Sequence, residues 1–169
     1  TRVALVSPVA NALYMAGGDN YRLAHTRDGV VLMVRAMREG LRVLKALGIA
    51  ITPPAVRAIE WVPEPILVAV LQRALDTPRA ALVVAGHANA ARDEMQELAD
   101  EFQALVRATS VATPAIDCLY TYLDSTVTPV AEGRAQIPLQ WRSLWIAIGA
   151  LGAMALVGQH LWRRRGRRP

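Results

Sequence analysis

The segment from Thr26 to Gly48, TRDGVVLMVRAMREGLRVLKALG, constrains the fold most, because its apolar residues recur every three to four positions. This spacing places them on one face of an α-helix and predicts that the face packs against a core. Thr26 is a good N-cap, Asp28 falls in the first turn, and Gly48 is a C-terminal stop. No alternating strand pattern of useful length appears elsewhere in the chain. The sequence therefore predicts an all-α body.

Further helices are expected on both sides of this segment. Residues 2–18 predict a helix that Gly17 and Gly18 close and that Pro8 kinks. The other expected elements are a short helix in the proline-rich connection 51–65, a helix at 63–75, one or two helices at 79–109 with Gly86 as a break, and a last helix with Thr113 as its cap and Pro114 at its first position.

The apolar segment Leu144–Trp162 carries no formal charge over nineteen residues. At about 1.5 Å per residue, this length crosses a hydrocarbon core of about 30 Å. Trp141, Trp145 and Trp162 stand at its ends, where indole rings favour a membrane interface, and RRRGRR follows. We predict a transmembrane helix at 141–163. The alternative is a buried hydrophobic hairpin or helix in a soluble protein.

The length of 169 residues allows one domain with a core, but not two full α/β domains. We expect a helical domain at 1–124, a linker at 125–140 that is rich in turn formers, the membrane segment at 141–163 and a basic tail at 164–169. Thr1 is followed at once by an apolar run without a methionine or a helix cap. We therefore expect the domain to be truncated at its N-terminus, as part of a longer polypeptide.

The net charge of +5 is a property of the tail, because five arginines lie in the last seven residues. The rest of the chain is about neutral, which argues against a nucleic-acid-binding surface. The one cysteine, Cys118, excludes an internal disulfide and lies in an apolar run, so we expect a buried thiol. His25 and His87 have no second ligand at i+3 or i+4, and we expect no metal site.

The stretch HANAARDEMQELADEFQAL, residues 87–105, contains the candidate site residue. Read as one helix, it carries a core-facing apolar stripe, and Asp93, Glu97 and Asp100 point away from that stripe. Glu94 lies at the edge of the stripe, in line with His87. It is either a boundary residue with a structural partner or a site residue. The stripe consists of Met95, Leu98, Ala99, Phe102, Leu105 and Val106.

Residues 2–123 resemble the C-terminal helical domain of the ketopantoate reductase (2-dehydropantoate 2-reductase) family. The resemblance rests on Asn11 in the first helix, on the ending KALGI of the long second helix, and on the distance from Glu94 to Pro114. The stretch SVATP before the last helix is similar to the family's small-x-x-x-Pro turn.

The resemblance implies a helical bundle like the 6-phosphogluconate dehydrogenase C-terminal domain. It also implies that an N-terminal Rossmann domain binds NADPH, that a small 2-oxo acid is reduced in the cleft between the domains, and that the helical domain forms a homodimer. Glu94 and Asn11 match substrate-binding positions of the family. The chain has no G-x-G-x-x-G after a strand, so no cofactor-binding residue is expected in it and this fragment alone would be inactive.

Three positions depart from the family pattern. Val3 stands where the family has its catalytic lysine, Ser7 where it has an earlier asparagine, and Leu82 where it has a serine. We therefore assign no catalytic residue. The first hypothesis is the substrate-binding and dimerisation domain of an NADPH-dependent 2-oxo acid reductase. The alternative is a non-catalytic, membrane-tethered helical interaction module derived from that fold.

The side of the membrane is open. The positive-inside rule keeps the arginine tail in the cytoplasm and places the body outside. A reductase needs cytoplasmic cofactor, and this favours a cytoplasmic body on a single-pass C-terminal anchor.

Overall fold

The computed structural model describes residues 1–142, 144–146, 148–149 and 154. These residues form helices and no strand, so the all-α prediction is confirmed. The elements are α1 (Arg2–Met15), α2 (Asn20–His25), α3 (Arg27–Ala46), the 3-10 helix η1 (Pro54–Arg57), α4 (Ala58–Trp61), α5 (Glu64–Leu75), α6 (Pro78–Ala80), the π-helix η2 (Ala81–Ala85), α7 (Gly86–Ala90), α8 (Arg92–Arg107), α9 (Pro114–Tyr120) and the 3-10 helix η3 (Thr121–Leu123).

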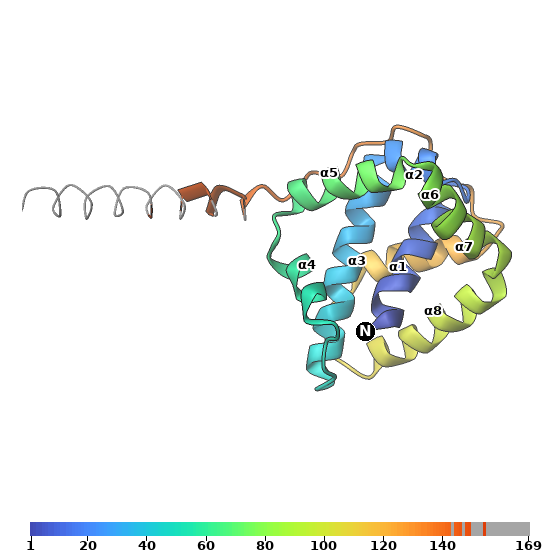
Figure 1. The fold of residues 1–169 in the computed structure, drawn as a ribbon. Coiled ribbons are helices and arrows are strands. Elements are labelled where there is room, and N and C mark those ends of the chain that lie inside the picture. The colour runs from blue at the N-terminus through green and yellow to red at the C-terminus, as the bar shows by residue number, and fades with distance from the viewer. Residues whose placement is uncertain (143, 147, 150–153, 155–169) are drawn as a thin grey trace, which may run out of the picture.

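Helices α1 and α3 pack against each other at the centre of the domain, and α4, α5, α7 and α8 surround them in Figure 1. Helix α9 packs on α3, and α8 packs on α1. The side chains of Leu13, Val34 and Leu41 are fully buried between these helices. Full burial of such a side chain contributes about 1.5–3 kcal/mol. The predicted core face of the long helix is therefore the centre of the fold.

Helix α1 ends in a tight turn made by two glycines. Gly17 and Gly18 have φ angles of 80° and 82°, which favour glycine, and the Gly18 amide donates to the Leu13 carbonyl at 2.8 Å. Helix α1 continues through Pro8. The turn leads into α2, which we did not predict; the Asp19 side chain caps it by accepting from the amide of Tyr21 at 2.8 Å. Six residues are too few to show a periodicity.

Thr26 and Thr113, the residues predicted as N-caps, stand directly before α3 and α9. Neither side chain makes a capping hydrogen bond to its helix. The Thr26 hydroxyl donates backwards to the Arg22 carbonyl at 2.8 Å. The first amides of α9 are bound by the buried carboxylate of Glu39 in α3, at 3.0 Å from Ala115 N and 2.9 Å from Ile116 N. A carboxylate is the stronger acceptor here, because hydrogen bonds to charged groups are about twice as strong as neutral ones.

The segment predicted as a linker runs along the helical body and is hydrogen-bonded to it at several points. The Val130 amide donates to the Met15 carbonyl at 3.0 Å. The buried Asp28 carboxylate accepts from the amides of Gln136 and Ile137, at 3.0 and 2.8 Å. Asp28 was predicted only as a first-turn residue of a helix, so its position in the fold gives it a second role.

Two further expectations concern the end of the chain and its cysteine. Most of 141–163 and all of 164–169 lie outside the described residues, and among the described residues no helix is long and apolar enough to cross a membrane. The prediction of a buried thiol is wrong, because Cys118 is exposed. Helix α9 buries Ala115, Ile116 and Leu119, and Cys118 lies off that face.

Candidate functional site

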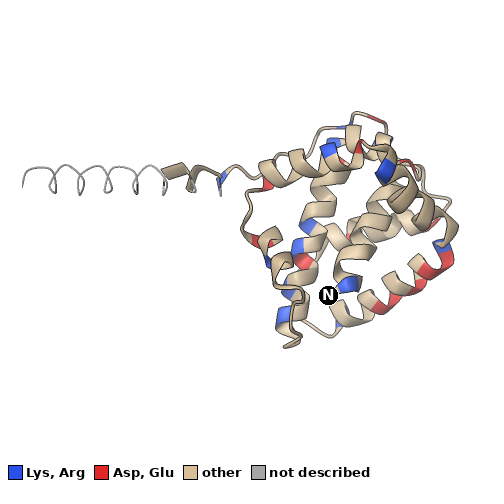
Figure 2. Ribbon diagram, viewed as in Figure 1, with Lys and Arg blue, Asp and Glu red and all other residues tan. Residues whose placement is uncertain are grey.

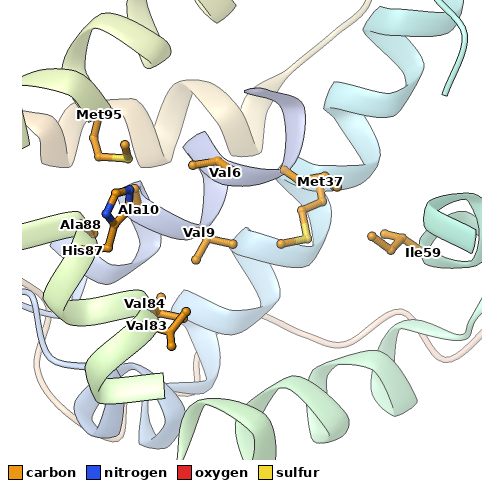
Figure 3. A pocket seen from close by; sticks show the side chains of 11 residues that line it. Val6, Val9, Ala10, Met37, Ile59, Val83, Val84, His87, Ala88 and Met95 are labelled. Atoms are coloured by element: carbon orange, nitrogen blue, oxygen red, sulfur yellow. The ribbon is translucent and has the colours of Figure 1, made fainter. Parts of the chain in front are cut away.

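A cavity of about 300 Å³ opens beside α1 and is the candidate ligand site (Figure 3). Its lining comes from α1, α3, α4, η2, α7 and α8, so it forms only when helices far apart in the sequence meet. The lining residues are apolar except for one histidine: Leu5, Val6, Val9, Ala10, Met37, Ile59, Val83, Val84, His87, Ala88 and Met95.

The lining determines what this cavity can hold. His87 is the one titratable residue in it, and Met37 and Met95 contribute adaptable thioether side chains. An apolar lining with few polar groups favours an apolar ligand or an apolar part of a partner, because little hydrogen bonding is offered. The cavity itself therefore supplies an apolar binding surface, with His87 as the only titratable side chain in its lining.

One wall of the cavity is a π-helix, which was not predicted. Helix η2 places Val83 and Val84 in the lining, while Leu82 and Val83 remain 78% and 60% exposed. π-Helical turns occur frequently at functional sites. Exposed large apolar side chains next to an apolar cavity are typical of binding surfaces.

Asn11, a predicted substrate-binding residue, does not line this cavity. It is 2% exposed, and its position on α1 is on the opposite side from Val6 and Val9. Its Nδ2 atom donates to the Ser7 hydroxyl at 3.5 Å, and its Oδ1 atom has no hydrogen-bond partner among the described residues. Asn11 and Ser7 therefore form a buried polar pair inside the domain.

Glu94, the other predicted substrate-binding residue, is exposed in the first turn of α8. It makes no hydrogen bond or ion pair within the described residues and does not line the cavity. The structure therefore does not bring Glu94 and Asn11 together in one cavity. Figure 2 shows acidic residues along α8. The predicted core stripe of α8 is confirmed for Met95, Ala99, Phe102 and Val106, while Leu98 and Leu105 are half-buried.

The predicted single helix 87–105 is divided at Ala91, and Gly86 is not the break. Ala91 has φ −118° and ψ 40°, and this removes Glu94 from its expected line with His87. Tyr14 explains part of the break: its hydroxyl donates at 2.7 Å to the carbonyl of Ala88, the acceptor that a continuous helix offers to the Arg92 amide. The Arg92 guanidinium then lies 4.3 Å from the centre of the Tyr14 ring.

The positions that depart from the family pattern differ in their surroundings. Val3 is half-buried at the start of α1, Ser7 is buried, and Leu82 is exposed on η2.

Among the described residues no group of three His, Cys, Asp or Glu side chains is arranged to hold a metal ion.

These features define an all-helical domain with an open apolar cavity bordered by a π-helix. No protein family, curated protein or solved structure matches the chain.

Proposed function

We propose that this chain is the substrate-binding and dimer-forming helical domain of an NADPH-dependent 2-oxo acid reductase of the ketopantoate type. Its bundle would be of the 6-phosphogluconate dehydrogenase C-terminal type, held at a membrane by residues 141–163. The observation that carries the proposal is the open apolar cavity beside α1, with Leu82 and Val83 exposed at η2. Such a surface is what a second, cofactor-binding domain would cover.

The parts of this reaction would be divided between two domains. A Rossmann domain outside this sequence would supply NADPH and the hydride. The apolar wall formed by residues such as Val9 and Val83 would keep water away from the transfer. Glu94, exposed in the first turn of α8, would accept a hydrogen bond from a substrate hydroxyl. No proton donor is assigned in this chain, because Val3 stands at the lysine position.

The size of the native polypeptide is the first test. An immunoblot of separated membrane and soluble fractions should show a membrane band larger than this 18.4 kDa chain by about 150 residues, the size of one more domain. A membrane band near 18.4 kDa would contradict the reductase proposal.

The second test measures NADPH oxidation by the full-length protein with ketopantoate and other 2-oxo acids. Glu94→Ala should lower kcat/KM about a hundredfold, the scale on which a positioned polar group acts. Glu101→Ala, which removes another exposed acid of α8, is the matched control and should leave the rate unchanged. An unchanged rate in Glu94→Ala would remove Glu94 from the site, and no turnover with any 2-oxo acid would overturn the proposal.

A second candidate function is the non-catalytic interaction module. The inward position of Asn11 and the apolar lining of the cavity favour it, because neither offers groups for a charged substrate. In that case the cavity would bind an apolar segment of a partner protein. This candidate predicts a membrane band near 18.4 kDa and no NADPH oxidation, which are the opposite results in both tests.

A further inference from the structure

A second cavity, of about 200 Å³, lies on the side of α3 that carries its arginines. Arg35, Arg38 and Arg42 line it, at i, i+3 and i+7 spacings that place them on one face of the helix. Figure 2 shows this line of positive charge along α3. Glu39, Glu64, Pro114 and Gln140 complete the lining.

Both glutamate side chains of this cavity already accept hydrogen bonds from groups of the fold. Glu64 is fully buried and accepts from Arg35 at 3.0 and 2.9 Å and from the Gln140 amide at 2.9 Å. Glu39 is 4% exposed and binds the first amides of α9, at 3.0 Å in the case of Ala115. The two carboxylates therefore act as structural acceptors and make no hydrogen bond with Arg38 or Arg42.

Arg38 and Arg42 consequently carry positive charge that no carboxylate of the cavity balances at hydrogen-bond distance. Arg38 donates only to backbone carbonyls, that of Ile59 at 2.9 Å and that of Val62. Arg42 is exposed and makes no hydrogen bond or ion pair within the described residues. Burial lowers the pKa of Arg38. The charges of Glu64 and Glu60 oppose this effect, and those of Arg35 and Arg42 add to it.

We propose that Arg38 and Arg42 form a binding site for a phosphate group. A guanidinium has five N–H donors in a rigid fork that matches phosphate oxygens, and both side chains keep donors that the fold does not use. The ion pair of Arg35 with Glu64 fixes the wall of the cavity, so part of the site is preorganised before the anion arrives. This inference does not depend on the proposed reductase activity, but its lipid-headgroup source rests on the membrane segment of the proposed function.

The position of the cavity is compatible with two sources for the phosphate group, a lipid headgroup and a free phosphate compound. Gln140 lines it, and the uncharged segment begins only a few residues later, at Leu144. When residues 141–163 span a bilayer, the site stands close to the level of the lipid headgroups and binds a phospholipid. Free phosphate or a phosphorylated small molecule is the other source. Both present the same oxygens to the two arginines.

The experiment uses the whole 169-residue chain in neutral detergent and in nanodiscs. Calorimetric titration with inorganic phosphate measures the free anion. Nanodiscs of phosphatidylcholine, with and without phosphatidylglycerol, measure the headgroup through the thermal unfolding midpoint of the helical body. Arg42→Gln is the main variant, because Arg42 is exposed and its loss should not disturb folding. Arg79→Gln, at another exposed arginine on α6, is the matched control.

We expect saturable binding in at least one arm. Arg42→Gln should raise the dissociation constant about tenfold or more and reduce the lipid-induced shift of the unfolding midpoint accordingly. Arg79→Gln should leave both unchanged. Loss of one charge-assisted hydrogen bond gives a change on this scale. Binding of inorganic phosphate assigns a free ligand, and a response to phosphatidylglycerol alone assigns the headgroup. No saturable binding in either arm, or equal losses in both variants, would overturn the site.

Discussion

The Arg35 guanidinium and the Glu64 carboxylate join α3 to α5 through two parallel hydrogen bonds, Nε to Oε2 at 3.0 Å and Nη2 to Oε1 at 2.9 Å. The Glu64 side chain is fully buried, whereas that of Arg35 is 24% exposed. Burial by itself raises the pKa of Glu64, but the hydrogen bonds from Arg35 and from the Gln140 amide, with the charges of Arg35 and Arg38, hold it below the usual value. The pair therefore fixes α5, and with it the end of the 125–140 segment, to the central helix.

Glu64→Gln should lower the free energy of unfolding by about 3–5 kcal/mol, because it leaves a guanidinium without its carboxylate at a buried contact. Urea denaturation at pH 7 measures this loss. Glu60→Gln breaks the more exposed pair with Lys45 and should cost less than about 1 kcal/mol. Equal losses in the two variants would show that burial of Glu64 does not govern its contribution.

Glu39 should make stability depend on pH in the opposite sense to Glu64. Burial raises the pKa of Glu39 in the folded protein, although the amides of Ile116 and Ala115 partly offset the effect. A raised folded pKa means that this contribution is complete below the unfolded value of 4.5 and is lost as the pH rises through the folded pKa. Relative to Glu39→Gln, which cannot ionise, the wild type should lose stability as the pH rises from 4.5 through the folded pKa. Parallel pH curves for the two proteins in urea unfolding would contradict this assignment.

Two glycines should respond in opposite directions to alanine. A Cβ at Gly40 would lie 3.0 Å from the side chains of Ala4 and Phe102 and 3.1 Å from the Ala4 carbonyl oxygen, so Gly40→Ala should destabilise the protein by about 1–3 kcal/mol. A Cβ at Gly86 would meet only the Ala81 carbonyl at 3.4 Å, and the backbone there is helical. Gly86→Ala should therefore gain up to about 1 kcal/mol. Thermal unfolding midpoints test both, and a gain at Gly40 would mean that α1 and α3 can separate without cost.

Cys118 should react with a thiol reagent in the native state, because it is exposed on α9. Partial desolvation of the Cys118 thiol by the surrounding protein raises its pKa, and the charge of Arg134 lowers it in part. The reaction at neutral pH should therefore be slower than that of free cysteine and should accelerate as the pH rises. Titration with a chromogenic disulfide before and after unfolding counts the thiol. Reaction only after unfolding would show that Cys118 is covered in solution.

The sequence predicted the long helices better than the short ones. The amphipathic pattern over 26–48 predicted α3, and the apolar stripe after residue 94 predicted the buried face of α8. Helix α2 and the break at Ala91 were missed, since one is too short for a periodicity and the other depends on Tyr14, far away in the chain. The candidate cavity was also missed, because its lining residues look like ordinary core positions in each helix.

The roles of the acidic residues separate what local sequence determined from what only the tertiary structure decided. The sequence alone determined the all-α class and the core faces of α3 and α8, because helical periodicity is a local property. It could not show that Glu39 and Glu64 are buried structural acceptors while Glu94 is exposed. Helical periodicity by itself does not distinguish these three glutamates. Their burial and hydrogen bonds depend on segments tens of residues away, such as the start of α9 and Gln140, and only the packed fold brings these segments together.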